Sequence, residues 1–266
     1  MIQPLYDAHV HLAAPSLLEK QEEIFATLSE IQVEKIVCNG TSPEDWPEVL
    51  NLAQSHSMVL PAIGLHPWKV QQTQADWKSH FIQCLHKGAA VVGEIGLDQW
   101  IEGYDSKRQL DAFRFQLNEA AQRNLPVSIH CLKAIGPLMD TLRNHPLPPR
   151  GFHLHAYNGP PELLRELVSL GAFFSFNAGQ LKPNRTKILH NICSVPAERL
   201  LIETDAPDFL PSTEQRPHQL NNLKYNHPAN LKAGYHAIAT IRKTDLDELI
   251  AQVGANFRRY FLASNR

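Results

Sequence analysis

The 266-residue sequence lacks several features that would place it in specialised protein classes. It contains no apolar run near the ~18 residues that a membrane-spanning helix needs. Its four cysteines are scattered without a C-x-x-C pair, and no charged segment followed by an apolar run opens the chain. We therefore expect a reduced, cytoplasmic protein that has no secretory signal and does not bind membranes.

The sequence also lacks an excess of charge of either sign. Its 25 Lys and Arg residues against 27 Asp and Glu residues give a net charge of -2. No global basic field attracts nucleic acid, so any phosphate binding must be local. With 43% hydrophobic residues the chain can bury a large core, and we expect one domain over 1–266, in a monomer.

Short β-rich runs alternate with helical patterns along the chain. This order is typical of repeated βα units around a parallel sheet, and eight such strands close a barrel. We therefore predict an α/β fold, a single (β/α)8 TIM barrel with a metal site at the C-terminal ends of its strands. The predicted strands are 4–10, 34–39, 57–64, 89–96, 126–131, 151–156, 171–176 and 199–205.

Several residues mark the ends of the helices between these strands. Ser42-Pro43 predicts a helix start, and Gly88 and Gly171 predict helix ends. Segment 105–124 repeats apolar residues at intervals of three and four, which indicates an amphipathic helix.

The stretch DAHVHL at 7–12 is polar at every second position. Because side chains alternate along a strand, Asp7, His9 and His11 should face the barrel interior. Tyr6, Ala8 and Val10 should then face the helices. His9 and His11 lie last on the strand, where two imidazoles can chelate a divalent metal. Alone the pair is a weak signal, because histidines also suit a polar strand end.

Other predicted strands end in ligand-type residues as well. Singly, each of them suits an ion pair with lysine or a hydrogen bond in the core. Together with the first strand they place six nitrogen and oxygen ligands at one end of five strands, which indicates two cations. Imidazole suits Zn or Fe, and carboxylate suits Mg or Mn. The additional ligand candidates are Glu94, His130, His155 and Asp205, with His153 and Glu203 placed deeper on their strands.

Further motifs follow in a fixed order along almost the whole chain. They are GLHPW at 64–68, GEIGLD at 93–98, LPVSIH at 125–130, HAYNG at 155–159, ETDAPDFLP at 203–211, NHPANL at 226–231 and NFRRYF at 256–261. With DAHVHL, this series resembles the TatD family of metal-dependent hydrolases. That family is often described as deoxyribonucleases and belongs to the amidohydrolase-like barrel superfamily.

The resemblance implies phosphodiester hydrolysis by a water that two divalent metals activate, whether Mg, Mn, Zn or Fe. Asp205 is then the candidate general base, and Glu94 the bridging carboxylate. The implied ligands are His9, His11 and Asp205 for one metal, His130 and His155 for the other, and Glu94 for both.

Other polar residues are candidates for supporting roles. We expect Asp7, Glu203 and His153 to orient ligands or to pair inside the barrel. His66, on the turn of the GLHPW motif, suits a phosphate contact, and equally a turn residue that bonds to backbone.

The sequence departs from the family pattern beside the fifth-strand histidine. The family commonly has an arginine two residues after it, whereas this chain has Leu132 followed by Lys133. A bidentate phosphate clamp is therefore missing, and Lys133 offers only a point charge. The usual aromatic after Asp98 is also displaced, to Trp100.

A segment of about 25 residues after the eighth strand is rich in proline and asparagine and shows no clear period. Loops of that length are usually functional or disordered. Because this one follows the catalytic end of the last strand, we expect it to border the substrate channel. Arg216 and Lys224 are its candidate substrate contacts.

Three functional classes stay open from the sequence. The first is a deoxyribonuclease acting on DNA, at single strands or strand ends, because a barrel rim admits an end more easily than a duplex. The second is a hydrolase of a small ester or amide, such as an aminoacyl ester. Leu132 weakens the case for the nuclease relative to this second class. The third is a metal-binding regulator without turnover, against which the retained ligand set argues.

Overall fold

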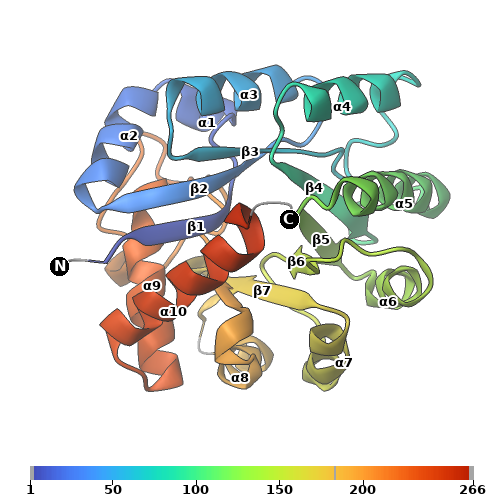
Figure 1. Cartoon of the computed structure of the whole chain (residues 1–266). Helices are drawn as coiled ribbons and strands as arrows, with labels where there is room; N and C mark the ends of the chain where they lie inside the picture. The colour runs from blue at the N-terminus through green and yellow to red at the C-terminus, as the bar shows by residue number, and fades with distance from the viewer. Residues whose placement is uncertain (1–2, 183, 264–266) are drawn as a thin grey trace.

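A computed structural model describes residues 3–182 and 184–263 and shows a ring of eight parallel strands surrounded by helices (Figure 1). The strands pair in chain order. Two hydrogen bonds close the ring, from Asp205 N to His9 O at 2.9 Å and from His11 N to Ala206 O at 2.8 Å. The predicted TIM barrel is therefore confirmed. The strands are β1 (Leu5–Val10), β2 (Val33–Asn39), β3 (Val59–Ile63), β4 (Val91–Asp98), β5 (Val127–Leu132), β6 (Phe152–Leu154), β7 (Ala172–Phe176) and β8 (Leu200–Ile202).

The helices form the outer layer and pack their apolar sides against the strands. They are α1 (Pro15–Leu18), α2 (Gln21–Glu30), α3 (Trp46–Ser55), α4 (Trp77–His86), α5 (Ser106–Arg123), α6 (Ile135–Asn144), α7 (Leu164–Ser169), α8 (Thr186–Ser194), α9 (Leu231–Arg242) and α10 (Leu246–Phe257). No helix in the described ranges is long and apolar enough to cross a membrane. All four cysteines are unpaired.

The amphipathic pattern and the glycine signals give helix boundaries correctly. Helix α5 begins after Asp105, whose side chain accepts a hydrogen bond from the backbone nitrogen of Arg108 at 2.9 Å. Gly88 and Gly171 follow α4 and α7 with positive φ angles of +108° and +98°. Both residues therefore end a helix as predicted.

The helix start predicted at Ser42-Pro43 is wrong. Helix α3 begins at Trp46, after a turn in which the carbonyl oxygen of Ser42 accepts from the backbone nitrogen of Asp45 at 3.1 Å. The carboxylate of Asp45 binds the backbone nitrogen of Thr41 at 2.9 Å, which holds this turn outside the helix. Pro47 is the proline of the first helical turn.

The predicted alternation of β1 is wrong in its lower half. Tyr6 and Ala8 belong to the apolar cluster that fills the barrel interior, together with residues of β2, β3, β4, β7 and β8. The register of β1 against β2 shifts after Leu5 and again after Asp7, as in a β-bulge. His9 and His11 still reach the interior, as predicted.

Asp7 stabilises this irregular strand. Its carboxylate accepts hydrogen bonds from the backbone nitrogens of His9 at 3.1 Å and Thr204 at 3.0 Å, and from the Thr204 hydroxyl at 2.6 Å. Burial raises the pKa of Asp7 to about 8. Asp7 therefore positions the backbone of β1 against the segment after β8, which fits the supporting role expected for it.

The C-terminal segment closes the lower end of the barrel. After α10 the chain continues as a π-helical turn, Arg258–Leu262, which lies near the middle of the ring of strands in Figure 1. The Tyr260 hydroxyl donates to the carbonyl oxygen of Val127 at 2.7 Å and accepts from its nitrogen at 2.9 Å. Phe261 packs beside it in the interior cluster. The interior is thus solid below the rim.

Gly96 lets β4 and β5 approach each other beside the rim, and replacing it should destabilise the protein. Its φ is +144°, and an added Cβ would overlap the carbonyl oxygen of His130. We expect Gly96→Ala to lower the free energy of unfolding by about 2 kcal/mol or more. Gly103→Ala is the control, because Gly103 has a φ of +69° and open space around it. Urea denaturation measures both, and equal losses would show that the contact with β5 has no part in the effect.

Candidate metal centre

The candidate ligands lie together at the C-terminal rim of the barrel. His9, Glu94 and His130 belong to β1, β4 and β5. The other three, His11, His155 and Asp205, lie just beyond the ends of β1, β6 and β8. The fold therefore brings all six predicted residues to one place.

The carboxylate of Glu94 lies at the centre of these residues. Its Oε2 is 3.3 Å from the Nε2 atoms of both His9 and His11. Its Oε1 is 3.0 Å from Nδ1 of His130 and 2.8 Å from Nε2 of His155. Each oxygen of Glu94 thus belongs to a different group of donors, as a bridging carboxylate requires.

Asp205 completes the first group. Its Oδ1 lies 3.4 Å from Nε2 of His11 and 3.7 Å from Nε2 of His9. Burial opposes ionisation of Asp205, but the hydrogen bond with His11 and the nearby His9 and His155 hold its pKa at about 2. Burial likewise opposes ionisation of Glu94, and the surrounding imidazoles hold its pKa well below the usual range. The centre therefore contains two ionised carboxylates.

Outer hydrogen bonds settle which nitrogen of two histidines points to the centre. The Nδ1–H of His11 donates to the carbonyl oxygen of Asn39 at 3.0 Å, which leaves Nε2 with a lone pair. The Nε2–H of His130 donates to Oδ2 of Asp98 at 2.8 Å, which leaves Nδ1 with a lone pair. In the neutral imidazoles both inner nitrogens carry a lone pair that can bind a cation. Burial opposes protonation of these histidines, but hydrogen bonds with the neighbouring carboxylates raise the pKa of both, so a bound cation would replace a proton there.

A series of hydrogen bonds across the barrel places the proton of neutral His9 on Nδ1 and leaves a lone pair on Nε2. A carboxylate at the far end can only accept, so every donor in the chain points toward it. The Nδ1–H of His9 donates to the Ser128 hydroxyl at 2.8 Å, and this hydroxyl donates to Nδ1 of His153 at 3.2 Å. The Nε2–H of His153 donates to the Ser175 hydroxyl at 2.6 Å, and this hydroxyl donates to Glu203.

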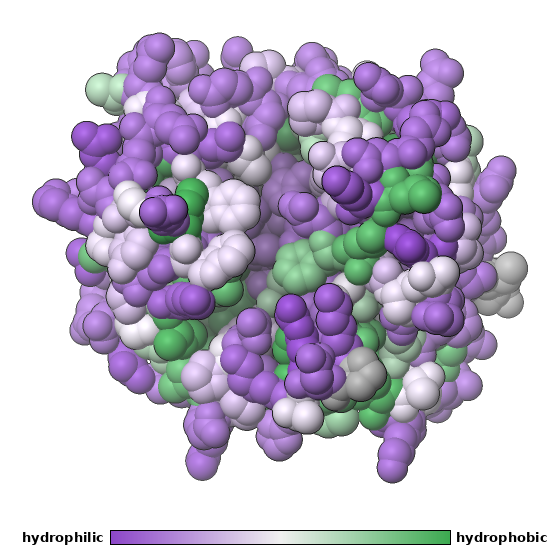
Figure 2. All heavy atoms as spheres, turned by 180° about the vertical axis from the view of Figure 1, so that it is seen from behind, coloured by the Kyte–Doolittle hydropathy of each residue, from purple (hydrophilic) through white to green (hydrophobic). Residues whose placement is uncertain are grey.

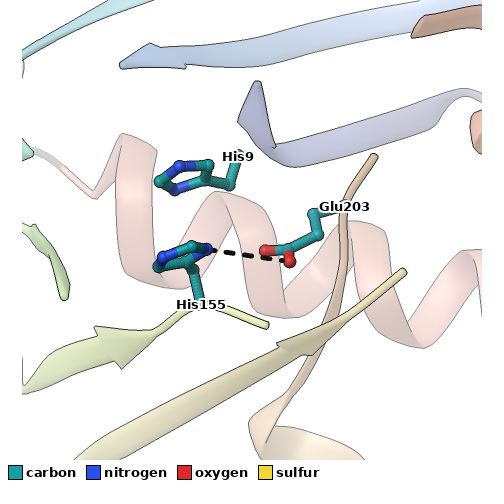
Figure 3. Close-up of side chains that lie close together, drawn as sticks. All are labelled: His9, His155 and Glu203. Atoms are coloured by element: carbon teal, nitrogen blue, oxygen red, sulfur yellow. Dashed lines mark ion pairs between the residues drawn. The ribbon is translucent and has the colours of Figure 1, made fainter. Parts of the chain in front are cut away.

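This chain gives Glu203 and His153 the supporting place expected for them. Figure 3 shows Glu203 pointing toward His155, whose Nδ1 is 3.9 Å from Oε1 of Glu203. Glu203 also accepts from the backbone nitrogen of Ala156 at 2.9 Å. Burial holds the pKa of His153 well below its usual range, so it stays neutral within the chain.

His66 reaches the centre in a different state. Its Nδ1 accepts from the backbone nitrogen of Trp68 at 3.1 Å, so its Nε2 carries the proton. This Nε2 lies 3.2 Å from Oε1 of Glu94. Burial lowers the pKa of His66 to about 4. His66 therefore offers a neutral N–H donor to the centre and no lone pair for a metal.

The remaining donor set fits divalent cations. The Nε2 atoms of His9 and His11 lie 3.3 Å apart, and Nδ1 of His130 lies 3.4 Å from Nε2 of His155. A cation bound between each pair would balance these nitrogens and the ionised carboxylates beside them. Nδ1 of His155 is also buried without a hydrogen-bond partner among the residues that the structure describes.

The centre opens into a cavity of about 740 Å³. Figure 2 shows this face, opposite to that of Figure 1, hollowed near its middle. Leu132 and Lys133 line the cavity, as do two cations that the sequence did not single out, Lys69 and Arg185. Only the base of the long segment after β8 lines it, at 207–209.

Arg216 and Lys224 do not line the cavity within the described ranges. The guanidinium of Arg216 donates to the carbonyl oxygen of Leu223 at 3.4 Å, and Lys224 is exposed. The segment is ordered by two short helical turns, Thr213–Gln215 and Pro228–Asn230. A substrate contact by Arg216 or Lys224 stays a prediction.

Sequence reasoning assigned no role to Asp98, although the residue lies in the GEIGLD motif. Asp98 is fully buried and binds His130, so it orients a candidate ligand. Burial opposes its ionisation, yet the hydrogen bond from His130 helps to hold its pKa at about 2. A carboxylate four residues after Glu94 on the same strand was the available signal.

Comparison with known proteins agrees with this geometry. The family described as TatD related DNase matches residues 6–262 of this chain. The chain belongs to this family of metal-dependent hydrolases. The resemblance seen in the motifs is thereby confirmed.

Individual relatives cover almost the same length. The chain is 28% identical over 258 residues to the uncharacterized metal-dependent hydrolase YabD of Bacillus subtilis, covering 97% of this chain and 98% of YabD. It is 28% identical over 260 residues to the 3'-5' ssDNA/RNA exonuclease TatD of Escherichia coli, with the same coverage. The crystal structure of YjjV, a TatD homologue from Escherichia coli, superposes with a TM-score of 0.90 at 26% identity, covering 99% of this chain and 100% of that one.

The position of Glu94 between the two donor groups predicts its effect on metal content. We expect the protein saturated with Mn, Zn or Fe to hold about two ions per chain. Glu94→Gln should lose affinity at both sites, because the amide supplies no charge to either. Elemental analysis after dialysis measures the content, with Glu162→Gln as a control outside the cavity. Loss of one ion with the other fully retained would contradict a bridging position.

Proposed function

We propose that this chain is a two-metal phosphodiester hydrolase that removes nucleotides from ends of single-stranded DNA. The observation that carries this proposal is the carboxylate of Glu94, with one oxygen in each of two donor groups. Sites of this kind suit an in-line displacement at phosphorus. The exonuclease name of its Escherichia coli relative supports single-stranded nucleic acid as the substrate.

The lone pairs described above support the ligand assignment that the family resemblance implies. His9, His11 and Asp205 would hold one ion and His130 and His155 the other, with Glu94 between them. Two divalent ions bound there would polarise the phosphate, lower the pKa of the attacking water and stabilise the leaving oxygen.

Residues of the chain then accept a proton and bind the phosphate. Asp205 is ionised and lines the cavity, so it accepts the proton of the attacking water. His66 directs its Nε2–H into the centre, where it donates to a phosphate oxygen. This assignment agrees with the phosphate contact expected from the sequence.

The surroundings of the cavity favour an extended strand end. Lys69, Lys133 and Arg185 line it and are exposed, so they supply local positive charge although the chain as a whole is slightly acidic. The interior is closed below the rim by the Tyr260 segment. The cavity therefore offers room for a strand end and no passage for a duplex.

The proposal extends to the state of the protein in the cell. We take 1–266 as one catalytic domain that acts as a monomer, because one barrel brings all six proposed ligands together. The four unpaired cysteines suit a reducing compartment such as the cytoplasm.

Activity on defined substrates tests the proposal directly. Metal-stripped protein is reconstituted with Mg, Mn, Zn or Fe and given labelled single-stranded DNA, duplex DNA, RNA and a panel of small esters. We expect nucleotide release from single-stranded ends, and a loss of at least about 1000-fold in kcat for Asp205→Asn with its melting temperature retained. Hydrolysis of small esters without release from any nucleic acid would refute the nuclease.

Leu132 favours a second candidate, a hydrolase of small esters or amides. Leu132 is an apolar side chain in the cavity lining, at the position where the family commonly has arginine. An apolar residue there suits an uncharged group of a small substrate. The same activated water would attack a carboxylic ester or an amide.

Leu132→Arg separates the two candidates. If the cavity binds a nucleic acid backbone, the guanidinium adds a charge-assisted hydrogen bond to phosphate, and kcat/KM on single-stranded DNA rises about tenfold at low salt. A small activated phosphodiester should gain less, because it needs no clamp. If Leu132 serves an apolar substrate, arginine lowers both activity and melting temperature. Steady-state kinetics on DNA and ester with thermal melts distinguish these results.

A further inference from the structure

Two tryptophans stand at the edge of the cavity next to the candidate metal centre. Trp68 follows β3 and Trp100 follows β4, and both line the cavity. They are 42% and 61% exposed, respectively. Removing large aromatic rings from water is energetically favourable. Two rings left open beside a reaction centre are therefore available to a substrate.

One buried carboxylate binds the side chain of Trp68 and the backbone of Trp100. Oδ2 of Asp98 accepts from the indole Nε1–H of Trp68 at 2.8 Å, and the same oxygen binds Nε2 of His130 at 2.8 Å. Oδ1 of Asp98 accepts from the backbone nitrogen of Trp100 at 2.7 Å. Asp98 thus fixes the indole of Trp68 and the backbone at Trp100 relative to a candidate metal ligand.

The distances place the Trp68 ring within reach of one nucleotide from the centre, and Trp100 lines the same cavity. The ring centroid of Trp68 lies 5.1 Å from that of His66 and 6.4 Å from that of His130. Lys69, the neighbour of Trp68, and Lys133 add positive charge at the same cavity. Exposed aromatics combined with cations are typical of proteins that bind single-stranded nucleic acid, because every base offers a π face.

We propose that Trp68 and Trp100 form a stacking subsite for the nucleobase beside the phosphodiester bond that is cleaved. This inference rests on the proposed nuclease function and adds its base contact. Stacking reads no hydrogen-bond pattern, so the subsite accepts any base. Asp98 is the positioning residue that keeps the subsite and His130 in one geometry.

The test combines changes in the protein with changes in the substrate. One substrate is a short single-stranded oligonucleotide, and the other is the same oligonucleotide with abasic residues at the last two positions of each end. Both are given to the metal-loaded full chain and to Trp100→Ala. Trp100 contacts Asp98 through its backbone, so this variant keeps the hydrogen bonds of Asp98 and removes only the ring.

We expect the wild-type KM to rise about tenfold or more when the terminal bases are removed, with a smaller change in kcat. Trp100→Ala should raise KM to a similar extent on the ordinary oligonucleotide and leave the abasic substrate nearly unchanged. Trp68→Phe loses the N–H and the second ring of the indole but keeps an aromatic face, so its base dependence should stay closer to that of the wild type. Trp68→Ala should lose the dependence of KM on the terminal bases.

Tyr104→Ala is the matched control. Tyr104 lies on the same loop as Trp100, between β4 and α5, and is 39% exposed, but it does not line the cavity. We expect it to leave KM for both oligonucleotides unchanged.

The possible results separate the subsite from the nuclease function. If the enzyme cleaves both oligonucleotides and Trp100→Ala and Trp68→Ala keep the wild-type base dependence, the subsite is refuted and the nuclease stands. An equal rise in KM on both substrates also refutes it, because a general disturbance of the rim does not depend on bases. If the loaded enzyme cleaves neither oligonucleotide but hydrolyses small esters, the nuclease function fails, and the base subsite fails with it.

Discussion

The buried carboxylate of Glu94 is the constraint on which the rest of the rim depends. A charge taken out of water is costly unless partners surround it, and here four candidate ligand histidines and His66 do so. Although burial opposes protonation, the carboxylates raise the pKa of His11, His130 and His155, so protons or bound cations can balance the charge of the cluster. The β-strands that deliver these side chains must therefore end at the same height around the ring.

Much of this arrangement could be predicted from the sequence. The eight strands could be recognised because their apolar runs alternate with helical patterns. Four of the candidate ligands could be recognised because they end such strands, and His9 and His11 because polar residues stand at every second position of the first strand. The site could be located because all strands of a parallel barrel end at one rim. Local residue patterns and the order of strands and helices can both be recognised in the linear amino-acid sequence.

Other features depend on contacts between distant residues and could not be predicted. The bulge in β1 depends on Asp7 binding Thr204, across 197 positions of sequence. The tautomer of His66 depends on a backbone nitrogen whose direction only the turn defines. The cations of the cavity, Lys69 and Arg185, lie in loops whose paths no periodicity indicates. The position of Asp98 between His130 and Trp68 also depends on tertiary contacts.

The closed lower end of the barrel has a consequence for how a polymer would be handled. Tyr260 and Phe261 fill the middle of the ring below the ligands, so no strand can thread through the molecule. A polymeric substrate would enter, and its products would leave, by the same opening. If the protein releases nucleotides from a strand end, each released nucleotide would have to leave before the shortened strand could advance. The closed floor of the barrel would then keep the strand outside the molecule throughout.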